Sequence, residues 1–291
     1  MFYTNNNITQ IDLNIYISMN IIVMKFGGTS VAGIEKLQNI ANIVSQEVKR
    51  NKVIVVLSAI AGETNKLQGY LDQFGSQNSI ESDLVLTSGE QVTIGLLSAA
   101  LKNDAIKSIP LLGWQIPIIT DDNHENAKIL KIDNKRIHKY FENNDVIVLA
   151  GFQGINLNGN ITSLGRGGSD TTAVAIASAI DAERCDIYTD VDGVYTADPN
   201  IEQNAKKISK MSYEEMLEMS STGAKVLHTR SVELAMKNNL TLQVLSSLTK
   251  KTGTFIVDEK ALIEKEIVSG VSYSKKEAKV TISGILDKPG I

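Results

Sequence analysis

The sequence contains few of the residues that mark a secreted, metal-binding or nucleic-acid-binding protein. Its single cysteine, Cys185, excludes an internal disulfide, and we expect a buried thiol ahead of an apolar strand and a reducing compartment, the cytoplasm. The three histidines have no metal-ligand spacing, which predicts no protein-built metal site. A net charge of −4 without a basic stripe argues against nucleic acid as a partner. No apolar run approaches the roughly 18 residues of a membrane span, so we expect no membrane partner.

What is present is an ordinary globular composition. The 291 residues are 43% hydrophobic and 21% charged, enough for one large domain or two smaller ones. Residues 1–18 are rich in asparagine and lack the cationic start and apolar core of a signal peptide. We therefore expect a loose or untranslated extension, with Met19 as the alternative start.

Strand and helix patterns alternate along most of the chain. Continuous apolar runs, typical of parallel strands buried on both faces, occur at 21–23, 53–57, 146–149, 187–188 and 242–245. Helical patterns occur between them at 34–48, 83–101, 169–180, 213–219 and 225–237. The alternation predicts an α/β fold, a three-layer αβα sandwich with a mainly parallel central sheet. Glycine-rich loops follow the predicted strands, where open α/β sheets bind their ligands.

The pattern changes near residue 258. Residues 259–266 are charged and linker-like, and 267–273 and 278–282 have strand patterns. We therefore divide the chain into the extension 1–18, a main domain 19–258, and a segment 259–291 that contains a linker and the incomplete start of a further domain. Some 25 residues cannot bury a core of their own.

A lysine and two glycines directly follow the first predicted strand. Glycines at 27 and 28 let the backbone approach an anion closely, and Lys25 supplies a compact positive charge. A helix start follows, whose free N–H groups also favour an anion. The alternative is a plain turn beside a solvated lysine. The spacing is neither that of a P-loop nor that of a dinucleotide-binding loop.

Two further segments carry weaker signals. Ser58 and Thr64 follow the strand at 53–57 and offer hydroxyls to a ligand, although a strand-to-helix loop with Thr64 as N-cap is the more economical interpretation. Glu90 lies in a helical stretch with apolar neighbours, where its carboxylate could pair with a substrate ammonium. The equal alternative is a first-turn glutamate that stabilises the helix dipole.

The strongest signal is the segment 165–170, which reads GRGGSD just before an alanine-rich helix. Arg166 can bind a carboxylate or phosphate with two parallel hydrogen bonds, and Gly167 and Gly168 bring backbone amides close to an anion. Asp170 is suited to orient Lys25 or a hydrated Mg²⁺. Helix capping by Ser169 or Asp170 would not explain an arginine between glycines.

A fifth segment, 188–199, follows a predicted strand with carboxylates, a glycine turn and an Asp-Pro stop. It could hold a nucleoside by its ribose hydroxyls and its ring, which the ring of Tyr195 favours. The alternative is a loop built from Asx turns.

Taken together and in this order, the segments resemble the aspartate kinases of the amino-acid kinase superfamily from about residue 20 to 291. The motifs are KFGGTSV (25–31), SGE (88–90), AGFQG (150–154), TSLGRGGSDTTAVA (162–175) and YTDVDGVYTADP (188–199). Acetylglutamate, glutamate 5- and uridylate kinases share the fold but do not combine KFGGTS with GRGGSD. The resemblance implies ATP-dependent, Mg²⁺-assisted phosphorylation of the L-aspartate side chain to 4-phospho-L-aspartate, which opens lysine, threonine, methionine and diaminopimelate biosynthesis.

The resemblance also implies the roles of individual residues. Lys25 and Asp170 would be catalytic, with Asp170 fixing Lys25, while Arg166 would clamp the substrate α-carboxylate and Glu90 its ammonium. The implied substrate-binding residues also include Ser58, Thr64, Gly167, Gly168 and Ser169. The implied ATP-binding residues are Lys25, Phe26, Gly27, Gly28, Thr189, Asp190, Tyr195, Asp198 and Lys225.

The carboxyl-terminal end departs from the family pattern. Aspartate kinases usually carry two regulatory ACT domains, and EAKVTISGILDKPGI matches only the opening of the first. Feedback control is therefore in doubt, and the contacts of a homodimer would be weakened. One interpretation is an active catalytic domain. The other is a non-catalytic remnant, or a subunit that needs a separate ACT chain. The presence of every expected catalytic residue favours the first.

Overall fold

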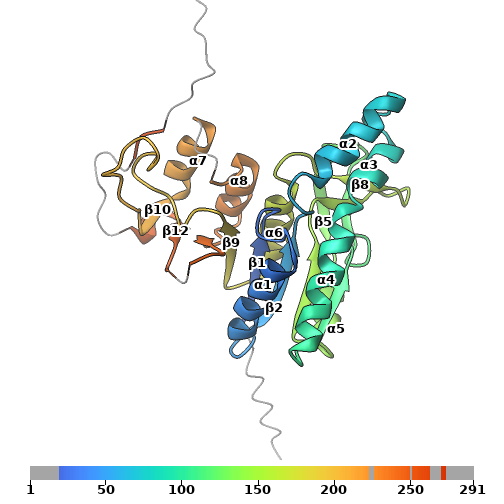
Figure 1. Ribbon diagram of the computed structural model, residues 1–291, viewed down its shortest axis with the longest axis horizontal. Helices are drawn as coiled ribbons and strands as arrows, with labels where there is room; N and C mark the ends of the chain where they lie inside the picture. Colours follow the sequence, from blue (N-terminus) through green and yellow to red (C-terminus); the bar gives the residue numbers. More distant parts are fainter. Residues whose placement is uncertain (1–19, 223–225, 250, 263–269, 273–291) are drawn as a thin grey trace, which may run out of the picture.

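The protein is an α/β sandwich in which helices cover both faces of a central sheet (Figure 1). The computed structural model describes residues 20–222, 226–249, 251–262 and 270–272. The three-layer architecture predicted from the alternating patterns is confirmed. The extension 1–18, Lys225 and almost all of the strand patterns expected after residue 266 lie outside the described residues.

The central sheet has eight strands in the order β10-β12-β11-β9-β1-β2-β6-β3, and every neighbouring pair is parallel except β11 and β12. Its strands are β1 (Ile21–Phe26), β2 (Lys52–Leu57), β3 (Ser108–Leu111), β6 (Val146–Ala150), β9 (Arg184–Thr189), β10 (Lys210–Ser212), β11 (Leu242–Ser246) and β12 (Thr254–Val257). The apolar runs became the central strands because helices bury both of their faces. Cys185 lies inside β9 rather than ahead of it, and its thiol is fully buried as expected.

Helices α1 (Ile34–Glu47) and α4 (Gly89–Asn103) pack on one face of the sheet. The opposite face is covered by α5 (Asn134–Phe141), α6 (Gly168–Ala179), α7 (Tyr213–Ser221) and α8 (Thr229–Lys237). Side chains alternate along β1, so Met24 and Phe26 face α1 and α4, whereas Val23 faces α6. Lys25 follows the same alternation and therefore also points toward α6.

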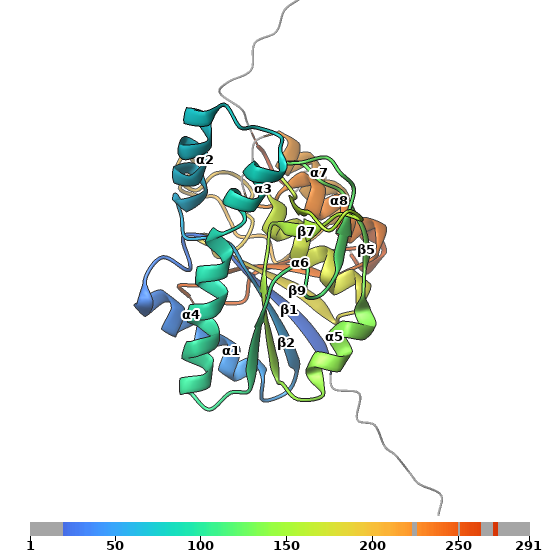
Figure 2. The ribbon, with the colours of Figure 1, turned by 90° about the vertical axis from the view of Figure 1, so that its right-hand side faces the viewer.

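A smaller four-stranded sheet in the order β5-β4-β7-β8 was not predicted. Its strands are β4 (Ile118–Thr120), β5 (Ile129–Ile132), β7 (Gln153–Ile155) and β8 (Ile161–Ser163), and they are too short to show a clear alternation. Helices α2 (Glu63–Phe74) and α3 (Ile80–Leu86) lie beyond the carboxyl ends of the central strands (Figures 1 and 2).

Two predicted helices have different bounds in the structure. The pattern at 83–101 was expected to be one helix, which is wrong, because the chain breaks at Thr87–Ser88 between α3 and α4. There the hydroxyls of Thr87 and Ser88 donate to main-chain oxygens of the preceding turn. The helix expected from residue 225 begins only at Thr229, since His228 has an extended backbone.

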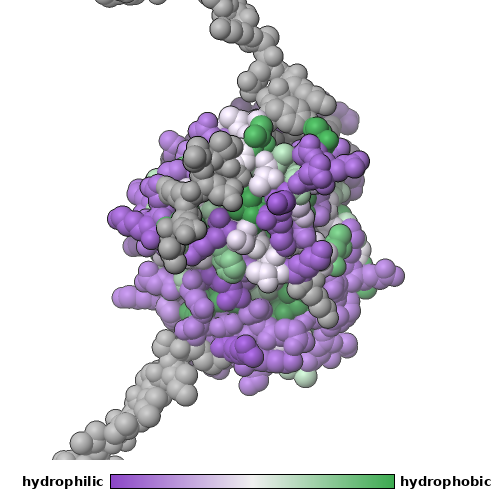
Figure 3. All heavy atoms as spheres, turned by 90° about the vertical axis from the view of Figure 1, so that its left-hand side faces the viewer, coloured by the Kyte–Doolittle hydropathy of each residue, from purple (hydrophilic) through white to green (hydrophobic). Residues whose placement is uncertain are grey.

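The short helix η1 (Glu259–Ala261) follows β12 in the region expected to be a linker. Farther along, the main chain of Val271 donates a hydrogen bond to the carbonyl of Thr196 at 2.8 Å. The end of the molecule that carries α7 and β10 presents a mostly hydrophilic face, with hydrophobic side chains scattered near its middle (Figure 3).

One stretch of the described chain, Ile80–Asn103, is long and apolar enough to cross a membrane by length and composition alone. Half of its most apolar window is buried inside the protein, and a core helix of a soluble protein meets the same criteria. This stretch is therefore weak evidence for a membrane span.

Candidate active site

The predicted loops converge at one edge of the central sheet. Strands β9, β1, β2 and β6 are adjacent and parallel, so their carboxyl ends lie side by side. Phe26 at the end of β1 is in register with Leu57 of β2 and with Tyr188 of β9. The loops after these strands, together with the start of α6, form the candidate site, where an open α/β sheet binds its ligand.

An ion pair lies at the centre of this edge. The Nζ atom of Lys25, from β1, is 2.7 Å from Oδ1 of Asp170, which lies in the first turn of α6. The side chains are 12% and 14% exposed, so the pair is largely withdrawn from water while a small part of each remains accessible. The contact expected between these two residues is present, and their catalytic roles remain predictions.

The glycine turn after β1 is held against the loop after β2. The main chain of Ala61 donates to the carbonyl of Gly28 at 3.1 Å. A Cβ atom on Gly28 would lie 2.7 Å from the carbonyl oxygen of Ala59, so only glycine allows this approach. A Cβ atom on Gly27 would lie 3.4 Å from the Lys25 ammonium. Glycine at 27 therefore leaves the space beside the cation open.

Phe26 has its side chain in the core rather than in the site. Its ring is fully buried and stacks on Tyr188 with ring centroids 4.4 Å apart. Any contact of residue 26 with a nucleotide would therefore be made by its main chain.

The turn before α6 projects Arg166 outward. Gly165 and Gly167, on either side, have φ angles of +74° and +71°, a conformation that favours glycine. Arg166 itself is exposed. Gly151 after β6 allows the helix to approach, because a Cβ atom there would lie 2.8 Å from Cβ of Ser169. The glycines thus place an exposed cation and the start of a helix at one edge.

Glu90 is a buried carboxylate with an unused oxygen. It lies in the first turn of α4, is 2% exposed, and accepts a hydrogen bond from the main chain of Ala59 through Oε1 at 3.0 Å. Its Oε2 atom is buried without a hydrogen-bond partner among the described residues, and burial raises the pKa of the carboxyl to about 7. A helix-dipole role alone does not explain this burial. The arrangement suits a carboxylate that receives a charged donor from a ligand.

The two hydroxyl residues expected after β2 lie in different kinds of structure, Ser58 in the loop and Thr64 in a helix. Ser58 is half-buried at the end of β2, and its carbonyl accepts from the Thr93 hydroxyl at 3.0 Å. Thr64 lies within the first turn of α2, whose N-cap is Gly62, so the alternative of Thr64 as N-cap is wrong.

The segment 188–199 forms hydrogen bonds within itself and also to residues outside it, such as the one from the main chain of Val194 to the Thr254 hydroxyl at 2.8 Å. Tyr195 donates its hydroxyl hydrogen bond to Asp192 at 2.7 Å, and this bond lowers the pKa of the Asp192 carboxyl. The Thr189 hydroxyl donates to Asp190 at 3.0 Å. Asp198 accepts from the main chain two residues on, so the Asx-turn alternative is correct for that residue. These contacts hold the loop in shape. The binding of a nucleotide by this segment stays a prediction.

Two supporting residues were missed from the sequence. Arg230 of α8 donates to the carbonyl of Leu164, just before the Arg166 turn, at 2.7 Å, and to that of Ala127 at 2.8 Å. Gln153 of β7 donates to the carbonyl of Thr87 at 3.2 Å. Gln153 lies inside the motif AGFQG, whereas Arg230 lies in none of the five motifs, and neither contact was visible in the sequence.

No cluster of three or more histidine, cysteine, aspartate or glutamate side chains that could hold a metal ion occurs within the described ranges. Any divalent cation at this edge would therefore need ligands from a bound molecule as well.

Comparison with known proteins agrees with this geometry. The model of the amino acid kinase family matches residues 20–246. An aspartate kinase from Pseudomonas putida is 47% identical over 276 residues, which cover 94% of this chain and 67% of the relative. An aspartokinase from Geobacillus stearothermophilus is 46% identical, with 92% and 66% covered.

Solved structures give the same result. E. coli aspartokinase III in complex with aspartate and ADP superimposes with a TM-score of 0.74 at 27% identity, covering 82% of this chain and 64% of that one. The aspartate kinase from Synechocystis gives a TM-score of 0.72 at 41% identity, covering 81% of this chain and 40% of that one. A UMP kinase from Bacillus anthracis, at 19% identity and a TM-score of 0.60, shares the fold alone. The chain thus spans about two thirds of its curated relatives and less of these aspartate kinase structures.

Proposed function

Because the chain belongs to the aspartate kinases of the amino acid kinase family, we propose that it transfers the γ-phosphoryl group of ATP to the side-chain carboxylate of L-aspartate. The products are 4-phospho-L-aspartate and ADP. The observation that carries the proposal is the Lys25–Asp170 pair beneath the glycine turn, at the edge of the sheet where four loops converge.

The chemistry needs charge neutralisation rather than a base. The aspartate side chain has a reference pKa near 4, so the nucleophile is already ionised at neutral pH. Two anions must meet, and a positioned cation lowers the repulsion between them in the transition state. The Lys25 ammonium supplies that cation, and Asp170 holds it at one orientation from the first turn of α6.

The amino-acid substrate fits between groups of opposite charge. Arg166 would bind its α-carboxylate, and the unused Oε2 atom of Glu90 would accept from its ammonium. Ser58, at the loop that donates to Glu90, and Thr64, at the start of α2, would line the same side. The helix-start residues Gly167, Gly168 and Ser169 would complete the anion-binding edge.

ATP would bind along the turn at 27–28 and the segment 188–199, on the β9 side of the ion pair. The complex of E. coli aspartokinase III with aspartate and ADP supports this nucleotide class. Mg²⁺ would be held mainly by ATP phosphates, as expected where the described residues offer no acidic cluster, and would neutralise phosphate charge.

We infer further that the reaction opens the biosynthesis of lysine, threonine, methionine and diaminopimelate, and that it takes place in the cytoplasm. The aspartate kinase relatives support this assignment as biosynthetic enzymes. The complete set of described site residues favours an active domain over a non-catalytic remnant. A homodimer remains a prediction.

An ADP-release assay on the full chain tests the proposal with aspartate, and with glutamate and UMP as the alternative acceptors. We expect ADP release that depends on aspartate and stays at background with the other two. A folded sample whose ADP release is the same with and without aspartate would contradict the proposal.

A further inference from the structure

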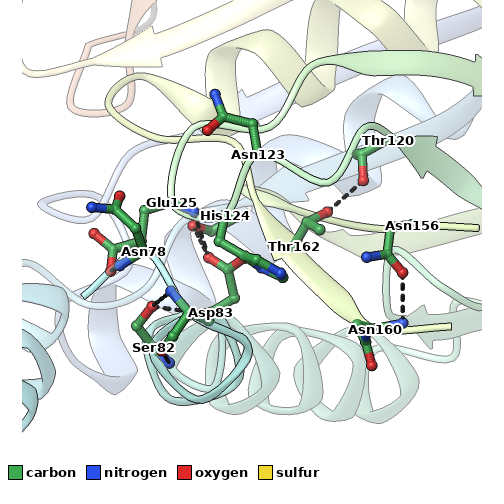
Figure 4. A network of polar contacts seen from close by, with 12 residues as sticks. Asn78, Ser82, Asp83, Thr120, Asn123, His124, Glu125, Asn156, Asn160 and Thr162 are labelled. Carbon is green, nitrogen blue, oxygen red and sulfur yellow. Dashed lines mark hydrogen bonds and ion pairs between the residues drawn. The ribbon is translucent and has the colours of Figure 1, made fainter. Parts of the chain in front are cut away.

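A buried carboxylate outside the proposed catalytic groups joins three separate segments of the chain. Asp83 of α3 is fully buried and lies beside His124 and Glu125, as Figure 4 shows. Its Oδ1 atom accepts from the Ser163 hydroxyl at 2.5 Å and from the main chain of Glu125 at 3.0 Å, and its Oδ2 atom is 2.6 Å from Nδ1 of His124. The contacts come from the end of β8 and from the loop between β4 and β5.

These hydrogen bonds fix the geometry around the Asp83 carboxylate. A buried carboxylate is costly unless hydrogen bonds replace its lost water, and three close donors replace it here. Removing one donor or altering the acceptor leaves buried polar groups unpaired. The three segments are therefore held in one relative arrangement, by contacts that span 41 to 80 positions along the sequence.

One end of this arrangement supports the turn that carries Arg166. Ser163 lies three residues before Arg166, and its carbonyl accepts from the main chain of Ala127 at 2.9 Å. A Cβ atom on Gly165 would lie 2.9 Å from the carbonyl oxygen of Glu125, so the loop bound by Asp83 is in direct contact with the turn. The Arg166 turn thus rests on groups that Asp83 holds.

The other end leads to Glu90. The Asp83 carbonyl accepts from the Thr87 hydroxyl at 2.8 Å, at the break between α3 and α4. Glu90 follows three residues later in the first turn of α4. Asp83 is therefore attached by its main chain to the segment with Glu90 and by its carboxylate to the segment with Arg166.

We propose that Asp83 is a positioning residue for the amino-acid substrate, because it sets the separation between Arg166 and Glu90. This rests on the proposed function, in which those two residues bind the α-carboxylate and the ammonium of aspartate. Nucleotide binding uses the other side of the ion pair, so Asp83 acts on aspartate and leaves ATP binding unchanged.

The test compares Michaelis constants for the two substrates in the full chain. Asp83→Asn keeps the volume but removes the negative charge and one acceptor oxygen, and its new amide donor lies opposite another donor unless the His124 ring changes its tautomer. We expect KM for aspartate to rise about tenfold to a hundredfold, as for a buried polar group left unpaired, with KM for ATP changed less than twofold. Calorimetric titration with aspartate alone should show the same loss of affinity.

Ser163→Ala is the milder variant, because it removes one bond to Asp83. We expect KM for aspartate to rise about three- to tenfold. Ser98→Ala is its matched control. Ser98 of α4 is also buried, and its hydroxyl forms a hydrogen bond of 3.0 Å with that of Ser108 in β3. The control should lower the melting temperature comparably and leave both Michaelis constants unchanged.

The outcomes separate the two proposals. A wild-type chain that neither binds nor phosphorylates aspartate overturns the proposed function and this inference with it. An active wild type whose Asp83 and Ser163 variants keep the KM for aspartate, or raise both Michaelis constants equally, overturns this inference alone. If Asp83→Asn does not fold, Ser163→Ala against Ser98→Ala decides.

Discussion

Lowering the pH from 8 to 6 should weaken aspartate binding about tenfold, because Glu90 then loses the charge that pairs with the substrate ammonium. Burial raises the pKa of Glu90 from 4.5 to about 7. A group with that pKa is about nine-tenths ionised at pH 8 and about one-tenth ionised at pH 6. If only the ionised carboxylate binds the ammonium, the apparent affinity follows this fraction.

The size of the pKa shift of Glu90 follows from the surroundings of its carboxyl group. The shift from 4.5 to about 7 corresponds to about 3 kcal/mol against the charged form, at about 1.4 kcal/mol per pKa unit. The hydrogen bond from Ala59 offsets part of the cost of burying the charged carboxylate, while Oε2 has no hydrogen-bond partner among the described residues. A bound ammonium would supply the missing partner and lower this pKa. Aspartate binding at pH 7 should therefore release about half a proton.

Calorimetric titration with aspartate, without nucleotide, is the appropriate assay because ATP phosphates also titrate near neutral pH. Titrations in two buffers of different ionisation enthalpy give the number of protons released. The control is Glu90→Gln, which should bind aspartate more weakly by about ten- to a hundredfold, independently of pH and without proton release. An affinity that stays constant from pH 8 to 6 in the wild type, or falls equally in the glutamine variant, would refute the reasoning.

Three further substitutions test the remaining groups. Lys25→Ala should lower kcat about 10²- to 10³-fold while aspartate still binds. Its control is Lys52→Ala, which breaks a 2.8 Å ion pair with Asp145 outside the site and should leave kcat unchanged. Equal kcat values in the two variants would refute the role of Lys25. Gly28→Ala forces a Cβ atom to within 2.7 Å of a backbone oxygen and should lower turnover. Its control, Gly69→Ala, has open space around the added Cβ atom and should raise the free energy of unfolding by about 0.5–1 kcal/mol. Turnover and thermal denaturation are measured for both variants. Arg166→Ala should raise KM for aspartate without changing the melting temperature, since that side chain is exposed, and an unchanged KM would contradict its assignment.

The central sheet could be predicted because its strands are continuous apolar runs. The run at 53–57 is fully buried, as a strand between two helical layers must be. The second sheet could not be predicted in the same way, because β7 and β8 have three residues each, too few to show an alternation, and join the rest of that sheet only through the pairing of β7 with β4, which is distant in sequence. The break between α3 and α4 was missed because the helical apolar pattern continues across Thr87 and Ser88.

In the candidate site, too, some residues could be predicted from the sequence and others could not. Lys25 and Asp170 were recognisable because each lies in a glycine-rich segment, and β1 and α6 bring them together. Asp83 and His124 gave no signal, since neither lies in such a motif and their contact joins residues 41 positions apart. Glu90 could be recognised by its position in a helix, but its unused oxygen and raised pKa depend on the packing of the loop after β2.

The most direct test of the account is detection of the acyl phosphate itself. The full chain is incubated with ATP, Mg²⁺, aspartate and hydroxylamine, which converts an acyl phosphate into a hydroxamate that ferric iron colours. We expect hydroxamate that depends on aspartate in the wild type and falls about 10²-fold or more in Lys25→Ala. A folded wild-type chain that forms no hydroxamate, or a lysine variant that forms as much as the wild type, would contradict the account.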